Sequence, residues 1–241
     1  RSPEDVERLN ILALGAIPSI PSFPGLDGRN EFMLSTDMAD GVTLGNIIPK
    51  YSEAAIVGGG FIGLEMAAAL KSRGYHKVYL LARRDILHAH FDKDMAEKLK
   101  NVITESGVEL ILPAKIESIE SQGDGKRVVL SDRELQVGFV FFATGAESNV
   151  ELARKAELEI GETGAIAVNQ YLQTSDRDIY AIGDCMENWD VIAGSKRRIL
   201  LATNAIRSGY IAGRNIVLNN AISYEGTVMP FVTKVFGHQI G

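Results

Sequence analysis

The amino-acid sequence predicts an α/β fold built on a parallel sheet, and three features of the chain indicate it. An apolar run at residues 55–57 leads into glycines at positions 58, 60 and 63. An apolar, alanine-rich stretch follows at 61–70, and a second apolar run occupies 77–81. Strand, glycine turn, helix and strand in this order form the start of a βαβ unit, from which parallel sheets are built.

Gly58, Gly60 and Gly63 have the G-x-G-x-x-G spacing of a dinucleotide-binding turn. The first glycine allows the tight turn, the second lets the backbone approach a pyrophosphate, and the third brings the helix close to the strand. Free N–H groups and the helix dipole then face the anion. We therefore expect a Rossmann-like nucleotide site here; the alternative is a tight turn that binds nothing.

The remaining elements are expected on both sides of this unit. Before it come a strand at 10–15, an extended connector rich in proline and glycine at 17–28, and a short helix within 37–49. After it we expect the following elements: a loop at 82–90, a helix at 92–106, a strand at 108–112, a hairpin of 116–121 with 127–130, and one buried strand at 135–143.

The last third of the chain returns to α/β character. A strand at 179–182 ends in Gly183 and Asp184, at the carboxyl end where open α/β sheets place ligands. Strand character resumes at 228–236. Between them we expect a helix whose small, closely packed face consists of Ala202, Ala205, Ile206, Gly209, Ala212 and Ile216.

Two similar strings, residues 13–16 and 143–146, each close an apolar strand with a glycine turn. One precedes the glycine-motif unit and the other follows it. This arrangement suggests that the nucleotide unit is inserted into another α/β domain; the alternative is a coincidence between short strings.

Composition and charge exclude several classes of function. The 241 residues are 46% hydrophobic with a net charge of −6, as in an ordinary soluble protein of one large or two small domains. The chain has no apolar run long enough for a membrane span, no signal-peptide pattern and no basic, aromatic-rich stretch for nucleic acid. The single Cys185 suits a reducing cytoplasm and leaves no thiolate metal cluster, so we expect no metal site.

The residues after the second strand bear on the choice of nucleotide. NADH enzymes usually have an acidic residue about 20 positions after the glycine motif to bind the ribose 2′-hydroxyl. Here Ala82 is followed by Arg83 and Arg84, whose guanidinium groups pair well with a 2′-phosphate. NADPH is therefore favoured over NADH, although solvated arginines are the alternative. His88 and His90 either assist or are merely exposed.

Several motifs occurring in order resemble one known family. They are Gly-Ala-Ile-Pro with its proline-rich connector, Gly-Gly-Gly-Phe-Ile-Gly-Leu-Glu, Ala-Thr-Gly-Ala, the Thr174 to Asp184 segment, the helix from Leu201, and Lys-Val-Phe near the end. Together they resemble the FAD-dependent pyridine nucleotide-disulfide oxidoreductases, in the branch of NADH oxidases, NADH peroxidases and coenzyme A-disulfide reductases. The likeness covers nearly the whole chain.

The resemblance implies a domain plan. Residues 1–45 and 144–219 look like two parts of an FAD-binding domain, 46–143 like the inserted NAD(P)-binding domain, and 220–241 like the start of a dimerisation domain. The start at Arg1 and the end at Gly241 suggest a fragment that lacks the first FAD motif and the redox-active cysteine, so we expect no catalytic residue in this chain. Cys185 has no cationic neighbour in sequence and is expected to be a buried packing residue.

The resemblance also assigns cofactor-binding roles. Phe61 resembles an aromatic gate over the nicotinamide face of the flavin, and Glu65 a glutamate near the nicotinamide; a core Phe and a surface Glu are the alternatives. Asp184 resembles the aspartate on the ribityl chain of FAD. The full predicted set is Gly58, Gly60, Phe61, Ile62, Gly63, Glu65, Arg83, Arg84, Thr144, Gly145, Gly183, Asp184, Leu201 and Ala202.

By this resemblance we expect a cytoplasmic, homodimeric flavoenzyme. Hydride passes from NAD(P)H to FAD, and electrons then pass through a cysteine to a disulfide, a persulfide, peroxide or oxygen. One alternative is a reductase component for ferredoxin or rubredoxin, which needs no cysteine. The other is a nucleotide-sensing module without catalysis.

Overall fold

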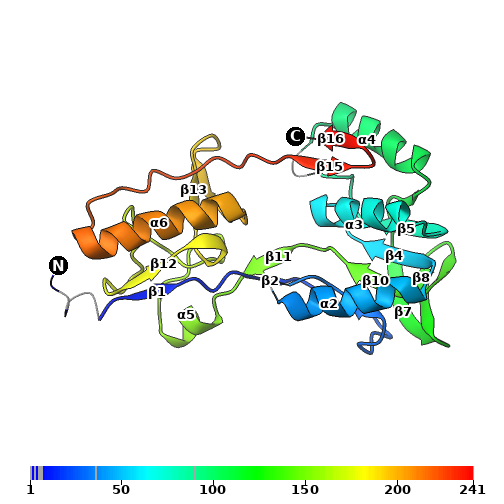
Figure 1. The fold of residues 1–241 in the computed structure, drawn as a ribbon, viewed down its shortest axis with the longest axis horizontal. Coiled ribbons are helices and arrows are strands. Elements are labelled where there is room, and N and C mark those ends of the chain that lie inside the picture. Colours follow the sequence, from blue (N-terminus) through cyan, green and yellow to red (C-terminus); the bar gives the residue numbers. More distant parts are fainter. Residues whose placement is uncertain (1, 3, 5–7, 36, 89–90, 241) are drawn as a thin grey trace. The chain divides into compact units, whose positions relative to one another are not determined.

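The computed structural model describes residues 2, 4, 8–35, 37–88 and 91–240. The chain forms two compact units, each described below by itself (Figure 1). The first combines Arg1–Ile17 with Ala146–Pro230, and the second combines Pro18–Gly145 with Phe231–Gly241. The second unit therefore interrupts the first. It begins at Pro18 and includes the strand and the helix that follow the connector.

A five-stranded sheet of parallel pairs forms the centre of the second unit. Its strands, in spatial order, are β3 (Glu31–Phe32), β10 (Phe139–Phe142), β4 (Glu53–Val57), β5 (Lys77–Leu81) and β6 (Glu109–Ile111). Its inner strands are continuous apolar runs because both faces of the sheet are covered.

Helices cover one face of this sheet. They are α2 (Met38–Ile47), α3 (Phe61–Ser72) and α4 (Lys93–Glu105), and the turn η1 (Ile48–Lys50) extends α2. The hairpin of β15 (Thr233–Val235) and β16 (His238–Ile240) packs into the same core. Asp37 caps α2 by accepting the N–H of Ala39 at 2.8 Å. The predicted helices at 61–70 and 92–106 are confirmed to within a turn.

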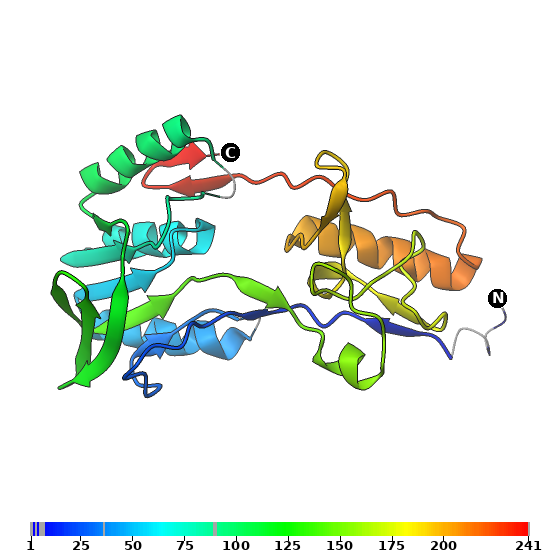
Figure 2. The ribbon, with the colours of Figure 1, turned by 180° about the vertical axis from the view of Figure 1, so that it is seen from behind.

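An antiparallel meander covers the other face (Figure 2). It consists of β7 (Ile116–Gln122), β8 (Gly125–Leu130) and β9 (Glu134–Val137), and its first two strands are the predicted hairpin. Lys126, in β8, has a fully buried side chain that forms ion pairs with Asp27, at 2.7 Å, and with Glu31. These pairs fasten the connector segment to the meander.

The prediction of one strand at 135–143 is wrong. The run is split at Gly138, so that β9 belongs to the meander and β10 to the parallel sheet. A Cβ atom on Gly138 would lie 2.2 Å from Cγ of Tyr51, which shows how closely the Tyr51 ring packs against the chain at this break. Residues distant in sequence therefore set the break.

The first unit contains a parallel pair, β1 (Asn10–Leu12) and β12 (Ile179–Ala181), with α6 (Ala202–Leu218) in the same core. The smaller elements are α5 (Glu151–Lys155), η2 (Gly183–Cys185), β13 (Asn188–Asp190) and β14 (Ser195–Arg197). No helix in the described part of the chain has both the length and the apolarity of a membrane span.

The buried face of α6 agrees with the predicted one only in part: Ala212 and Ile216 are buried, as predicted. Ala202 and Ile206 are exposed, and Ala205 and Gly209 are half-buried. The helix presents a partly polar face inward because its amide and hydroxyl groups make hydrogen bonds there. The buried residues are Asn204, Ser208, Ile211, Ala212, Asn215 and Ile216.

The chain crosses between the units three times, and the first two crossings, at residues 17–18 and 145–146, pair with each other. β2 (Ala16–Pro18) and β11 (Ala146–Ser148) form a two-stranded sheet. Gly145 O accepts the N–H of Ser19 at 2.9 Å, and Gly15 O accepts the N–H of Asn149 at 3.0 Å. The repeated glycine strings therefore lie at the first two crossings.

Candidate nucleotide-binding sites

The glycine turn lies at the carboxyl edge of the sheet, between β4 and α3. Gly58 has φ +127°, and a Cβ there would lie 2.1 Å from the backbone oxygen of Ala143. A Cβ on Gly63 would lie 2.0 Å from the oxygen of Gly58. The fold itself therefore requires glycine at positions 58 and 63.

Gly60 differs from its neighbours. Its φ of −87° is available to any residue, and a Cβ there would have no described heavy atom within 4 Å. Packing within the chain does not require this glycine. It is the N-cap of α3, where no described side chain caps the helix, so the first turn offers backbone N–H groups to an anion. Ile62, in that turn, is 49% exposed.

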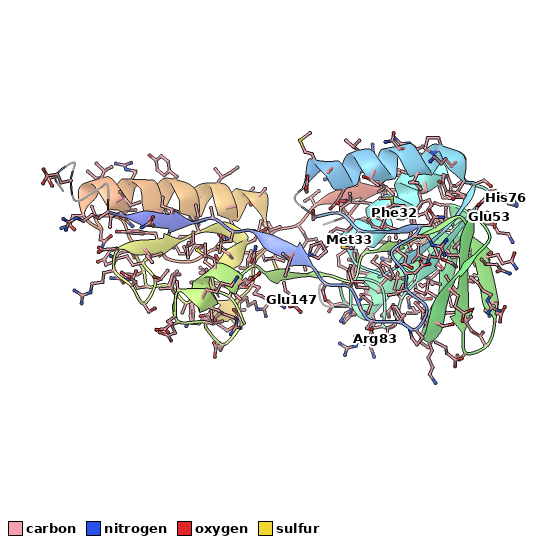
Figure 3. All side chains as sticks on the ribbon, turned by 90° about the horizontal axis from the view of Figure 1, so that it is seen from below. Phe32, Met33, Glu53, His76, Arg83 and Glu147 are labelled. Carbon is pink, nitrogen blue, oxygen red and sulfur yellow. The ribbon has the colours of Figure 1, made fainter. Side chains whose placement is uncertain are left out.

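The segment after β5 lies against the glycine turn. Gly59 O accepts the N–H of Leu87 at 3.0 Å, and a Cβ on Gly59 would lie 2.8 Å from Cδ1 of Ile86. Arg83 and Arg84 open this segment, and both are exposed. Figure 3 shows Arg83 at one end of the sheet and Glu53 and His76 at the other.

Asp85 is an acidic group next to these arginines, but it is engaged elsewhere. Its carboxylate forms an ion pair with Lys100 of α4 at 2.9 Å and also accepts the N–H of Ile86. The hydrogen bond from Lys100 holds the pKa of Asp85 below its ordinary value. His88 is exposed, and His90 lies outside the described residues.

Two residues that the sequence did not single out hold Phe61 and Glu65. The ring of Phe61 packs against Phe231 with 4.8 Å between centroids. The exposed Glu65 accepts a hydrogen bond from Oγ1 of Thr233 at 2.5 Å. Both partners lie about 170 positions further along the chain, and only the tertiary fold brings them to α3.

Thr144 and Gly145 follow β10 at the same edge of the sheet. The Thr144 hydroxyl donates to the backbone oxygen of Ser19, and Gly145 has φ +104°. The backbone of Ala143 also meets Gly58 at the close approach described above. The ends of β10, β4 and β5 therefore bring three predicted segments together: the glycine turn, residues 83–84 and residues 144–145.

The other predicted residues lie in the first unit, around η2. The Oδ1 atom of Asp184 is buried and has no hydrogen-bond partner in the described part of the structure. Burial raises the pKa of this carboxyl group. A buried acceptor without a partner is costly, so a ligand hydroxyl or N–H would satisfy it.

Ser208 of α6, which sequence reasoning missed, fixes the position of this turn. Its Oγ accepts the N–H of Gly183 at 3.0 Å and donates to Asn204 O at 2.8 Å. Leu201 is the N-cap of α6 and Ala202 its first residue, with no side-chain cap in the described structure. Asn204 donates its N–H to Leu201 O, so the N–H groups that precede it in this turn are the ones available to a ligand.

Cys185 is a packing residue, as predicted. It is fully buried, its Sγ lies 3.2 Å from Ile182 O, and burial raises the pKa of its thiol. A buried thiol with a raised pKa is a poor nucleophile.

Comparisons with known proteins identify the family of the chain. Residues 7–209 match the family described as pyridine nucleotide-disulphide oxidoreductase. An NADH oxidase of Methanocaldococcus jannaschii is 37% identical over 231 residues, which cover 90% of this chain and 50% of that protein.

Solved structures show the same likeness. An NAD-dependent persulfide reductase from A. fulgidus superposes with a TM-score of 0.89 at 34% identity, over 95% of this chain and 42% of that one. An engineered water-forming NADPH oxidase with NADPH bound superposes with a TM-score of 0.88 at 25% identity, over 94% of this chain and 50% of that one. The chain thus spans about half the length of the proteins it matches. It belongs to the pyridine nucleotide-disulphide oxidoreductase family.

Proposed function

We propose that the protein is an FAD-dependent oxidoreductase that takes electrons from NAD(P)H, with a preference for NADPH. The second unit holds the dinucleotide, and the first unit supplies part of the FAD site. The observation that carries this proposal is the open approach at Gly60, directly beside a segment that begins with Arg83 and Arg84. By family likeness, the proposal includes a homodimer in the cytoplasm.

The glycine turn would bind the pyrophosphate. Gly60 leaves room for the anion, and the N–H groups of the first turn of α3 point toward it. The exposed Ile62 would cover part of the nucleotide, and Thr144 and Gly145 would line the same edge. These residues position and shield the dinucleotide, which is the contribution a protein makes to cofactor chemistry.

Arg83 and Arg84 support the preference for NADPH. Two guanidinium groups can donate several charge-assisted hydrogen bonds to a 2′-phosphate, and the chain has no acidic residue at Ala82 to favour a free hydroxyl. The engineered NADPH oxidase gives further support. It was solved with NADPH bound, and the likeness to it covers 94% of this chain.

The buried, unpartnered Oδ1 of Asp184 supports an FAD site. A hydroxyl of the ribityl chain would donate to this atom, and the uncapped first turn of α6 would present N–H groups at Leu201 and Ala202. When bound, FAD accepts a hydride from the nicotinamide and releases electrons to the next acceptor.

The names of the relatives support the range of acceptors. They include oxidases, a persulfide reductase and CoA-dependent sulfur oxidoreductases. We propose a disulfide, a persulfide, peroxide or oxygen as the acceptor.

Calorimetric titration of the chain with NADPH and NADH, at low and moderate salt, tests the dinucleotide site. We expect NADPH to bind at least tenfold more tightly, a difference of about 1.4 kcal/mol. Arg83→Glu should reverse that order because a carboxylate repels the 2′-phosphate. Equal affinity for both nucleotides would refute the preference, and absence of binding by either would refute the assignment of the turn.

A further inference from the structure

The segment between β6 and β7 brings the backbone of a third cationic residue, Lys115, close to the start of the segment that carries the two arginines. After β6 the chain continues alongside the end of β5, to which β6 is parallel. Ala82 donates its N–H to Ile111 O at 3.1 Å, and Ala82 O accepts the N–H of Ala114 at 2.8 Å. Lys115 is the next residue, so its backbone lies beside the start of the 83–84 segment.

Lys115 is exposed, like Arg83 and Arg84. In the described structure none of the three forms an ion pair or a side-chain hydrogen bond. Glu117, two residues further along and also exposed, forms no ion pair with Lys115 there. In a chain with a net charge of −6, three unpaired cations at one edge of a sheet form a local positive site.

The nearby acidic group does not oppose this charge. Asp85 pairs with Lys100, which also pairs with Glu97 at 3.0 Å, so its carboxylate is neutralised on the side of α4. A phosphate monoester offers three oxygens and nearly two negative charges. Two guanidinium groups from one segment and one ammonium group from the adjacent segment match that charge and shape.

We propose that Lys115 is a specificity-determining residue that binds the 2′-phosphate of NADPH together with Arg83 and Arg84. This inference rests on the proposed preference for NADPH. It adds a residue outside the usual loop after the second strand, placed there by the hydrogen bond between Ala114 and Ala82.

Calorimetric titration of Lys115→Met with NADPH and NADH is the test. The dissociation constant for NADPH should rise about fivefold to tenfold and that for NADH should not change, because only NADPH carries the 2′-phosphate. The difference in NADPH affinity between native protein and Lys115→Met should shrink as salt is raised, as expected for a solvent-exposed contact. Lys115→Arg, which keeps the charge, should retain most of the preference.

Lys77→Met is the matched control. Lys77 is exposed at the amino end of β5, so the same charge is lost at the far end of the same strand. An equal loss of NADPH affinity in both variants would overturn the proposal, because net charge would then account for it. So would an unchanged ratio of the two affinities in Lys115→Met. If Arg83→Ala lowers the ratio of NADPH affinity to NADH affinity and Lys115→Met does not, the inference about Lys115 fails while the proposed function stands. If the native protein shows no preference for NADPH over NADH, the proposed function itself fails.

Discussion

Adding a single methyl group at Gly60 or at Gly58 should separate the binding role of the glycine turn from its folding role. A Cβ at Gly60 meets nothing described within 4 Å and φ is −87°, so Gly60→Ala should cost less than about 1 kcal/mol, the usual penalty for alanine at an N-cap. At Gly58, φ is +127° and the Cβ would lie 2.1 Å from Ala143 O. Strain of about 1–3 kcal/mol and overpacking of about 1–3 kcal/mol together give roughly 2–6 kcal/mol.

Urea unfolding measures the effect of each substitution on stability, and calorimetric titration measures its effect on nucleotide binding. Gly60→Ala should unfold close to the native midpoint, yet bind NADPH and NADH each at least tenfold more weakly, or about 1.4 kcal/mol, because the methyl group occupies the approach to the pyrophosphate that both share. Native affinity in Gly60→Ala would show that the open space does not receive the pyrophosphate. A stable Gly58→Ala would show that the turn relaxes more easily than its geometry implies.

Three further predictions concern the contacts around the sheet. Lys126→Met should destabilise the protein by about 3 kcal/mol in urea unfolding, because it leaves Glu31 without its cation, while the exposed Lys155→Met should cost less than about 0.5 kcal/mol. Lys126 holds the pKa of Asp27 well below its usual value of 3.8, so the stabilisation of the fold by the ionised Asp27 is complete above that pH and is lost as pH falls below it. Asp27→Asn should therefore lose less thermal stability than native protein between pH 6 and pH 3. An equal loss in both proteins would contradict this. Thr233→Val removes a hydrogen bond to Glu65 worth about 1 kcal/mol, so amide exchange in the 233–240 hairpin should quicken; unchanged protection would mean that apolar packing alone holds it.

Local signals in the sequence were sufficient for the elements around the glycine turn. The apolar run at 77–81 has the bounds of β5, and Asp92 and Ser106 cap α4 at the predicted ends. Such elements are specified by residues next to each other in the chain. The closeness of the glycine turn to residues 83–84 also follows from these local signals, because parallel strands bring their carboxyl ends to one edge of the sheet.

Other features depend on residues far apart in sequence. The break at Gly138 accompanies the close packing of Tyr51, and the inward face of α6 depends on partners for Asn204 and Ser208 that an apolar count overlooks. The contact of Thr233 with Glu65 spans 168 positions. A single sequence carries no signal for such pairings.

The pairing of β2 with β11 has a topological consequence. The chain leaves the first unit and re-enters it at adjacent points, with Ser19 bonded to Gly145 and Gly15 to Asn149, as in the two arms of a hairpin. For the first unit, the 128 residues from Pro18 to Gly145 act as one very long hairpin loop, and closing a loop costs only about 0.6 kcal/mol for each doubling of its length. A gene encoding the first unit could therefore have accepted this segment in place of a short turn with little thermodynamic penalty. By the same reasoning, a short turn joining the two arms should restore a continuous hairpin.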